Sequence, residues 1–163
     1  MRFLAAFFIA VLYWATTITA APAIIKPFKV CDATAKGPFL RQRQEAALKD
    51  FAKLFLIDKN PKAAFDKYIP GEYIQHNPDA LSGREPAIAY LITLQATPGL
   101  VYSNITLIAG NGLGLLHYRR KSVQADMDMA IMDRMGFKGT CMNEHWDVRQ
   151  RIYGNETNPL AFF

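Results

Sequence analysis

The residues best suited to chemistry are polar side chains that share a strand face with apolar ones. Alternation along the expected strands predicts four of them, His117, Asp133, Glu144 and Gln150. Asp133 is the clearest case, because Met127, Met129 and Ile131 precede it on the same face. A buried carboxylate beside an imidazole can transfer protons near neutral pH. We therefore predict that Asp133 and His117 form an acid–base pair facing an interior.

Structural roles stay open for both residues. A lone histidine on an apolar face is usually a hydrogen-bonded core residue, and an aspartate at a strand end often closes a turn. Such groups mark functional sites only statistically. No histidines and cysteines have the close spacing of metal ligands, so we expect no metal site. Proton transfer of this kind also needs no cofactor.

The last expected strand, residues 142–152, has two unlike faces. One face mixes apolar and polar residues: Met142, Glu144, Trp146, Val148 and Gln150. The other is wholly polar: Asn143, His145, Asp147 and Arg149. We expect the mixed face to line the interior and the polar face to meet solvent or a partner chain.

Three helices should precede these strands. Apolar residues at helical spacing predict the first over about residues 39–58. The second begins at Asn60-Pro61, an N-cap followed by a first-turn proline. The third begins at a capping box, Ser82 to Glu85, and runs to about residue 94, with Ile88, Leu91 and Ile92 as its buried stripe.

Four strands follow the helices. Alternation predicts them at residues 101–109, 112–119, 127–133 and 142–152, with a hairpin turn at Asn111-Gly112. Helices that precede an antiparallel sheet indicate an α+β fold, with the helices on the concave face. Such an arrangement can enclose a pocket.

The N-terminus predicts secretion. Arg2 precedes an apolar run from Phe3 to Trp14, and small residues follow up to Ala23. This is the pattern of a signal peptide cleaved after Ala20 or Ala23, because the run is too short to span a bilayer. We assign residues 1–23 to the signal and residues 24–163 to one domain, with no membrane attachment after cleavage.

Secretion into an oxidising compartment bears on the two cysteines and on two glycosylation sequons. Cys31 and Cys141 are the only cysteines, and they are expected to form one disulfide, the alternative being two buried thiols. Asn104 and Asn155 begin N-glycosylation sequons. Both asparagines should therefore face solvent.

The charge distribution argues against nucleic acid as a partner. The formal net charge is +5, but the basic residues are scattered apart from Arg119-Arg120-Lys121. A nucleic-acid interface needs a continuous basic face and a structural element that contacts the bases, and this short run supplies neither. We expect a small hydrophobic ligand or substrate instead.

Two stretches resemble the SnoaL-like polyketide cyclase branch of the nuclear transport factor 2-like superfamily. Tyr73 to Pro78 followed by Gly83 is similar to one of its motifs, and Glu144 to Gln150 is similar to its last strand. Asp133 lies eleven residues before Glu144, at the family's spacing. The chain departs from the family at Gly136, where an arginine is usual.

The resemblance implies a cone-shaped fold, often dimeric through the sheet, with three helices on about four long curved strands. It implies a cyclase or isomerase in which Asp133 or His117 is the base and His76 orients or relays. The ligand-binding residues expected with them are Tyr73, Glu144, Trp146 and Gln150. Two alternatives stay open: a secreted small-ligand binding protein, and an extracellular interaction protein using the polar face of the last strand.

Overall fold

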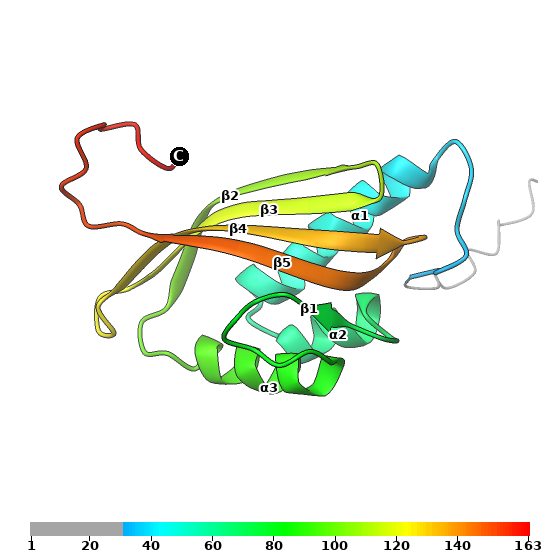
Figure 1. Cartoon of the computed structure of the whole chain (residues 1–163), viewed down its shortest axis with the longest axis horizontal. Coiled ribbons are helices and arrows are strands. Elements are labelled where there is room, and N and C mark those ends of the chain that lie inside the picture. Colours follow the sequence, from blue (N-terminus) through cyan, green and yellow to red (C-terminus); the bar gives the residue numbers. More distant parts are fainter. Residues whose placement is uncertain (1–30) are drawn as a thin grey trace, which may run out of the picture.

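Three α-helices and five strands make up residues 31–163, the part of the chain that the computed structural model describes (Figure 1). The expected signal peptide, residues 1–23, lies outside the described residues. Between residues 31 and 163, no helix is long and apolar enough to cross a bilayer.

The helices come first in the chain. They are α1 (Leu40–Ala52), α2 (Pro61–Tyr68) and α3 (Arg84–Gln95), and a π-helical turn over Lys53–Ile57 extends α1. Asn60 caps α2 as predicted, because its Oδ1 accepts the Ala63 N–H at 2.9 Å. The capping box predicted for α3 is wrong: Gly83 occupies the N-cap, and the Ser82 hydroxyl bonds to the segment around Gln75 instead.

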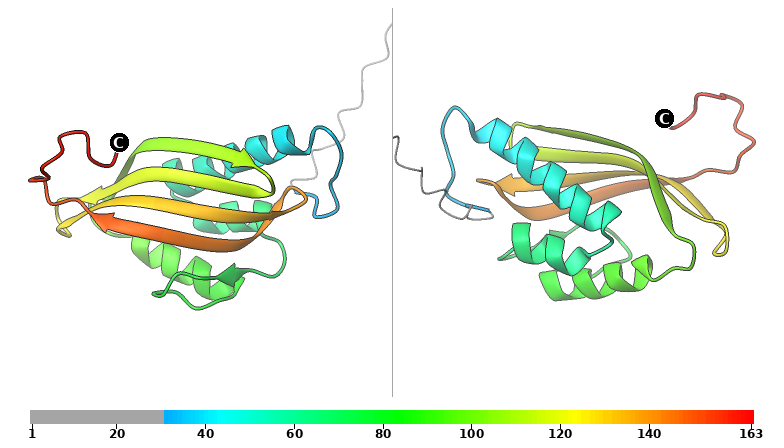
Figure 2. Two further views of the ribbon diagram at one scale, coloured as in Figure 1. Left: turned by 45° about the horizontal axis from the view of Figure 1, so that its top comes forward. Right: turned by 180° about the vertical axis from the view of Figure 1, so that it is seen from behind.

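The strands form one sheet in the order β1-β5-β4-β3-β2. The four long strands are β2 (Val101–Gly110), β3 (Leu113–Ser122), β4 (Met127–Lys138) and β5 (Cys141–Arg151). They are antiparallel, and the two-residue β1 (Ile74–Gln75) adds a parallel edge strand beside β5. All three helices lie on one face of the sheet, and within residues 31–163 no helix covers the other face (Figure 2). The predicted α+β architecture is confirmed, with one short strand more than expected.

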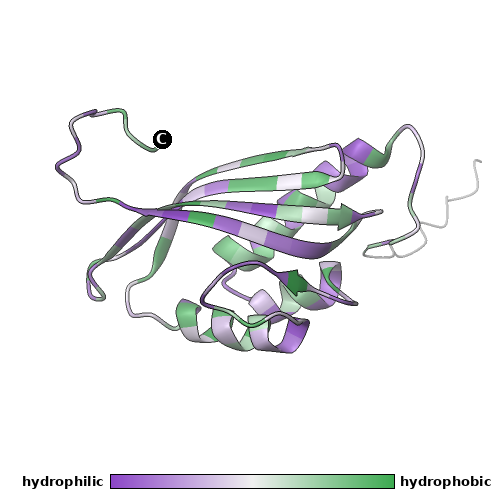
Figure 3. Cartoon of the chain, in the orientation of Figure 1, coloured by the Kyte–Doolittle hydropathy of each residue, from purple (hydrophilic) through white to green (hydrophobic). Residues whose placement is uncertain are grey.

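Apolar side chains from both layers meet between the helices and the sheet. The largest buried side chains include Leu48 of α1, Phe65 of α2, Leu116 of β3 and Ile131 of β4. Hydrophilic and hydrophobic residues both occur along the strands of the sheet (Figure 3). The predicted stripe of α3 is correct at Ile88, which is buried, and wrong at Ile92, which is half exposed.

A β-bulge near the start of β5 decides which side chains face the helices. Phe137 pairs with Met142, but the neighbouring Gly136 pairs with Glu144, so β5 has one extra residue at this point. Because successive side chains alternate between faces, the extra residue shifts the alternation by one position. Met142 and His145 therefore lie on the same side of the sheet.

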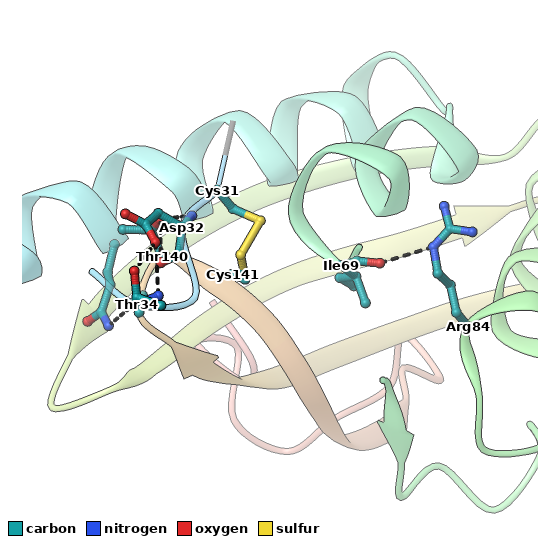
Figure 4. The surroundings of a disulfide bond; sticks show 9 residues. Cys31, Asp32, Thr34, Ile69, Arg84, Thr140 and Cys141 are labelled. Carbon is teal, nitrogen blue, oxygen red and sulfur yellow. Dashed lines mark hydrogen bonds between the residues drawn. A yellow bond between two sulfur atoms is a disulfide. The ribbon is translucent and has the colours of Figure 1, made fainter. Parts of the chain in front are cut away.

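The disulfide ties the N-terminal segment to the start of β5. Cys31 and Cys141 are bonded, with their Cα atoms 4.9 Å apart (Figure 4). Next to it, the Asp32 N–H donates to the Thr140 hydroxyl at 2.8 Å, and the Thr140 N–H donates to the Asp32 carbonyl at 2.9 Å. The predicted pairing of the two cysteines is confirmed.

Candidate functional site

The helices and the inner face of the sheet enclose a cavity of about 50 Å³. Aromatic and aliphatic side chains form much of its wall: Phe51, Phe55, Phe65, Tyr90, Leu91, Leu94, Ile131 and Met135. Its polar residues come mainly from the sheet and from the segment around β1: Tyr73, Gln75, Asn77, Tyr118, Arg120, Asp133, His145, Asp147 and Arg149. A volume of this size holds about four water-sized groups.

Asp133 lies in the cavity wall, on the face that sequence alternation predicted. It is only 6% exposed. The Tyr118 hydroxyl donates a hydrogen bond to Asp133 Oδ2 at 2.8 Å. On the other side, Asp133 Oδ1 lies 3.3 Å from Nε2 of His145, a residue that the sequence placed on the opposite face. The bulge in β5 brings this imidazole inward.

The proton positions on His145 follow from its neighbours. Gln75 Oε1 accepts the backbone N–H of Asn77 at 3.1 Å, which fixes this atom as the amide oxygen. His145 Nδ1 lies 2.6 Å from the same oxygen and must carry a proton to bond with it. Nε2 therefore faces the Asp133 carboxylate, where a proton between the two atoms relieves the repulsion of their lone pairs. Asp133 Oδ1 and His145 Nε2 are thus placed so that a proton can pass between them.

The pKa of His145 is raised. Burial lowers it, but hydrogen bonding with Asp133 and the negative charges of Asp133 and Asp147 together raise it more. Burial and the nearby charge of Asp133 also raise the pKa of Tyr118 and of Tyr73 well above the ordinary phenol value. Both hydroxyls are therefore protonated at neutral pH and can donate hydrogen bonds.

Asp147 is a second carboxylate in the cavity wall. Its Oδ2 accepts hydrogen bonds from Asn77 Nδ2 at 2.7 Å, and it lies 3.2 Å from Arg149 Nε. Its Oδ1 is buried and has no hydrogen-bond partner among the described residues. This free acceptor is available to a ligand hydroxyl or N–H group.

The expectation that His117 faces Asp133 is wrong. Leu116 and Tyr118 occupy the inner face of β3, and both are buried, so His117 points to the uncovered face. There its ring stacks on Phe163 with the ring centroids 4.9 Å apart. The prediction failed because both faces of β3 carry leucine, which leaves the alternation ambiguous.

Three of the four expected ligand-binding residues also lie outside the cavity wall. The bulge turns Glu144, Trp146 and Gln150 to the uncovered face, so their expected inward orientation is wrong. His76 joins them there: its Nε2 lies 2.9 Å from Glu144 Oε1, and its ring stacks on Trp146 with the centroids 4.6 Å apart. Of these predicted residues, only Tyr73 lines the cavity.

The sequons occupy surface positions. Asn104 is exposed on β2, at an irregular point where its φ is +54°. Asn155 is exposed in the segment that follows β5. Both side chains are accessible to modification. Among residues 31–163, no group of three or more histidine, cysteine, aspartate or glutamate side chains is arranged to hold a metal ion.

Comparison with known proteins supports the fold. No protein-family model and no curated protein matches the chain. A nuclear transport factor 2-like protein of unknown function from Mesorhizobium loti matches at a TM-score of 0.57 and 12% identity, over 72% of this chain and 98% of that one. This likeness shows that the chain has a nuclear transport factor 2-like fold.

Two other solved structures have the same fold. One, assigned as a ketosteroid isomerase from Kribbella flavida, matches at a TM-score of 0.56 and 10% identity, over 72% of this chain and 85% of that one. The other, assigned as a polyketide cyclase from Acidithiobacillus ferrooxidans, matches at 0.54 and 20% identity, over 67% of this chain and 89% of that one. At these identities, the likeness concerns the fold alone.

Proposed function

We propose that this nuclear transport factor 2-like chain is a cofactor-independent cyclase or isomerase that moves protons on a small hydrophobic carbonyl compound. The observation that carries the proposal is the pair of Asp133 and His145, whose Oδ1 and Nε2 atoms lie 3.3 Å apart at the wall of a largely apolar cavity. The assigned activities of the two solved structures, an isomerase and a cyclase, belong to the same class of chemistry.

The chemistry begins at a carbon next to the substrate carbonyl. Asp133 accepts a proton from this carbon, and the electron pair of the C–H bond moves to give an enolate. The protonated Nε2 of His145 donates a hydrogen bond to the enolate oxygen. In an isomerisation, Asp133 returns the proton to another carbon; in a cyclisation, the enolate carbon attacks a second carbonyl, whose oxygen takes the proton. No electrons leave the substrate in either case.

The cavity limits the size of the reacting part of the substrate. A volume of about 50 Å³ accepts only a few heavy atoms in this conformation. A polycyclic substrate would have to displace the side chains that α3 contributes to the wall, Tyr90, Leu91 and Leu94. We therefore propose a small substrate.

One observation favours a second candidate, a non-catalytic binding protein. Both oxygens of Asp133 already have partners, Tyr118 and His145, so the carboxylate could serve only to hold the sheet together. The polar row of β5 was expected to bind a partner protein in an extracellular interaction protein. His145, Asp147 and Arg149 of this row line the cavity instead, so the row does not offer a surface to a partner.

The test is proton exchange. The protein is incubated in D₂O with acetone or butanone, and deuterium uptake at the carbon next to the carbonyl is followed by NMR. The Asp133→Asn variant should lose ~10²–10⁴ in rate, the usual loss for a positioned acid or base. Asp128→Asn is the matched control, because Asp128 lies on β4 but pairs with Arg119 and Lys121 away from the cavity.

The two candidates give different results. An enzyme exchanges deuterium, and Asp133→Asn stops the exchange while Asp128→Asn does not. Exchange no faster than that of the Asp133→Asn variant, together with a small molecule retained in native mass spectrometry, supports the binding protein and rejects the enzyme.

Secretion is part of the proposal. The disulfide between Cys31 and Cys141 supports an oxidising compartment, and the exposed Asn104 and Asn155 are suited to glycosylation. The mature chain should begin after Ala20 or Ala23. N-terminal sequencing and glycan mass analysis of secreted protein test this, and an intact Met1 on a membrane-bound form would refute it.

We also propose a homodimer through the uncovered face of the sheet. Ile108, Met132 and Val148 are exposed there. Asn104 borders the same face beside Phe163, so a glycan would keep that corner outside the interface. Val148→Asp should convert a dimer into a monomer in sedimentation experiments. A wild-type protein that sediments as a monomer at high concentration refutes the proposal.

A further inference from the structure

Arg120 is a cation buried in the cavity wall without a counter-ion. It is 8% exposed, and its Nε is buried with no hydrogen-bond partner among residues 31–163. No ion pair within those residues includes it, although three other arginines of the sheet, Arg119, Arg149 and Arg151, each have a carboxylate partner. A buried charge without a partner is unfavourable, so an arginine kept in this state is suited to binding an anionic ligand.

The carboxylates of the cavity are already engaged. Asp133 lies against His145, and Asp147 lies against Arg149. These two pairs leave Arg120 as the one charge without a partner among the charged residues that line the described cavity. Arg149 also lies 2.5 Å from the exposed Asp79, so these groups together have no net positive charge. An anionic ligand is expected because Arg120 itself has no direct partner among residues 31–163.

The neutral neighbours of Arg120 do not replace that anion. Tyr102 lies opposite Arg120 across β2 and β3, and its hydroxyl is buried without a partner. Gln95 Oε1 is a further buried oxygen without a partner in the described chain. These groups can hydrogen-bond to an oxyanion or to Arg120, but they supply no compensating charge.

We infer that Arg120 binds a carboxylate on the ligand, so that the substrate is a small oxo-carboxylate. A planar carboxylate matches the fork of guanidinium donors, and the cavity is too small for bulky anionic groups. The inference rests on the proposed function for its carbonyl, whereas the carboxylate follows from Arg120 alone.

The sheet sets the distance between the two ends of this ligand. Arg120 pairs with Met129, and Asp133 pairs with Leu116, so the two residues are offset by four positions along neighbouring strands. Four positions correspond to ~13 Å of strand. Tyr118 lies between them on the same face, and the long arginine side chain spans part of the offset. Both side chains line the same cavity, so the ligand's carboxylate lies toward Arg120 and its carbonyl toward Asp133.

The test compares acids with their amides. Acetate and butyrate are titrated against acetamide and butyramide, with binding followed by NMR. Each acid should bind the unmodified protein roughly tenfold or more tightly than its amide, because charge-assisted hydrogen bonds are the stronger kind. Arg120→Met should abolish the preference. Arg134→Met is the control, because it removes the same charge from the uncovered face, where Arg134 stacks on Trp146 at 4.0 Å.

The outcomes separate this inference from the proposed function. Equal binding of acids and amides to the unmodified protein overturns the inference, and this comparison does not depend on whether a variant folds. A preference for acids that survives in Arg120→Met also overturns it. An acid preference retained in a protein without proton exchange supports the role of Arg120 and rejects the enzyme. Asp133→Asn should keep the preference, since Asp133 contributes no positive charge.

Discussion

Asp133 and Asp147 lie directly opposite each other on β4 and β5, with both carboxylates on the inner face of the sheet. Residues in such a pair have Cβ atoms about 4.5–5.5 Å apart, and like charges there destabilise a sheet. Each aspartate has its own cation, His145 for one and Arg149 for the other. The positive charge on His145 therefore stabilises the fold as well as serving the proposed chemistry.

The pKa of His145 should report on both aspartates. Asp133 raises this pKa more than Asp147 does. Asp133→Asn should therefore lower it further than Asp147→Asn, and Asp128→Asn should leave it unchanged. An NMR titration of the imidazole measures all three. A pKa that Asp133→Asn does not move contradicts the proposed proton sharing.

Stability should fall as the pH rises above neutrality. The folded-state pKa of His145 is raised above the value of about 6.5 expected in the unfolded chain. Its contribution to the free energy of unfolding is therefore fully present below about pH 6.5 and is lost as the pH rises through the folded pKa. Urea unfolding across this range should show the loss in the wild type and not in His145→Gln. Parallel curves for the two proteins refute the prediction.

Gly139→Ala should destabilise the protein strongly. Gly139 has a φ of +60°, and a Cβ there would lie 2.1 Å from the Asp32 carbonyl oxygen. Both the backbone conformation and the contact are unfavourable, so the free energy of unfolding should fall by more than about 1 kcal/mol. Gly110→Ala is the control, because a Cβ at Gly110 meets nothing within 4 Å. Equal stability of the two variants contradicts this account.

Loss of the disulfide should cost ~2–5 kcal/mol of unfolding free energy, because the bond closes a long loop. Cys31 and Cys141 are 110 positions apart in the sequence. The double variant Cys31→Ser, Cys141→Ser should unfold at lower urea concentration than the oxidised wild type. Alkylation under non-reducing conditions checks the starting state, and two free thiols there contradict the bonded structure.

The sequence predicted the inner face of β4 correctly because only that face is apolar without interruption up to Asp133. Met127, Met129 and Ile131 set the alternation, and no bulge separates them from Asp133. The fold class and the order of elements were predictable for a similar reason, since the helical and strand periods differ clearly along the chain. The turn at Asn111-Gly112 was also correct, with both residues at positive φ.

The partner of Asp133 was not predictable from alternation. The bulge beside Gly136 adds one residue to β5 and reverses the faces of every residue after it. The polar row of His145, Asp147 and Arg149 was visible in the sequence, but its direction depends on this one residue. The sequence did contain a signal for this site, namely the polar row itself. An imidazole, a carboxylate and a guanidinium on one strand face can form a functional site as well as a solvent-exposed surface.

The position of the disulfide also has a mechanical consequence. In the oxidised protein, Cys31 to Cys141 form a closed loop that cannot be extended by pulling on the chain, and it contains Tyr118, Arg120 and Asp133. Beyond the loop lie 163 − 141 = 22 residues, which include most of β5. At full extension these residues span about 75 Å. Tension on the C-terminus therefore acts first on the strand that carries His145, Asp147 and Arg149, which lies outside the closed loop.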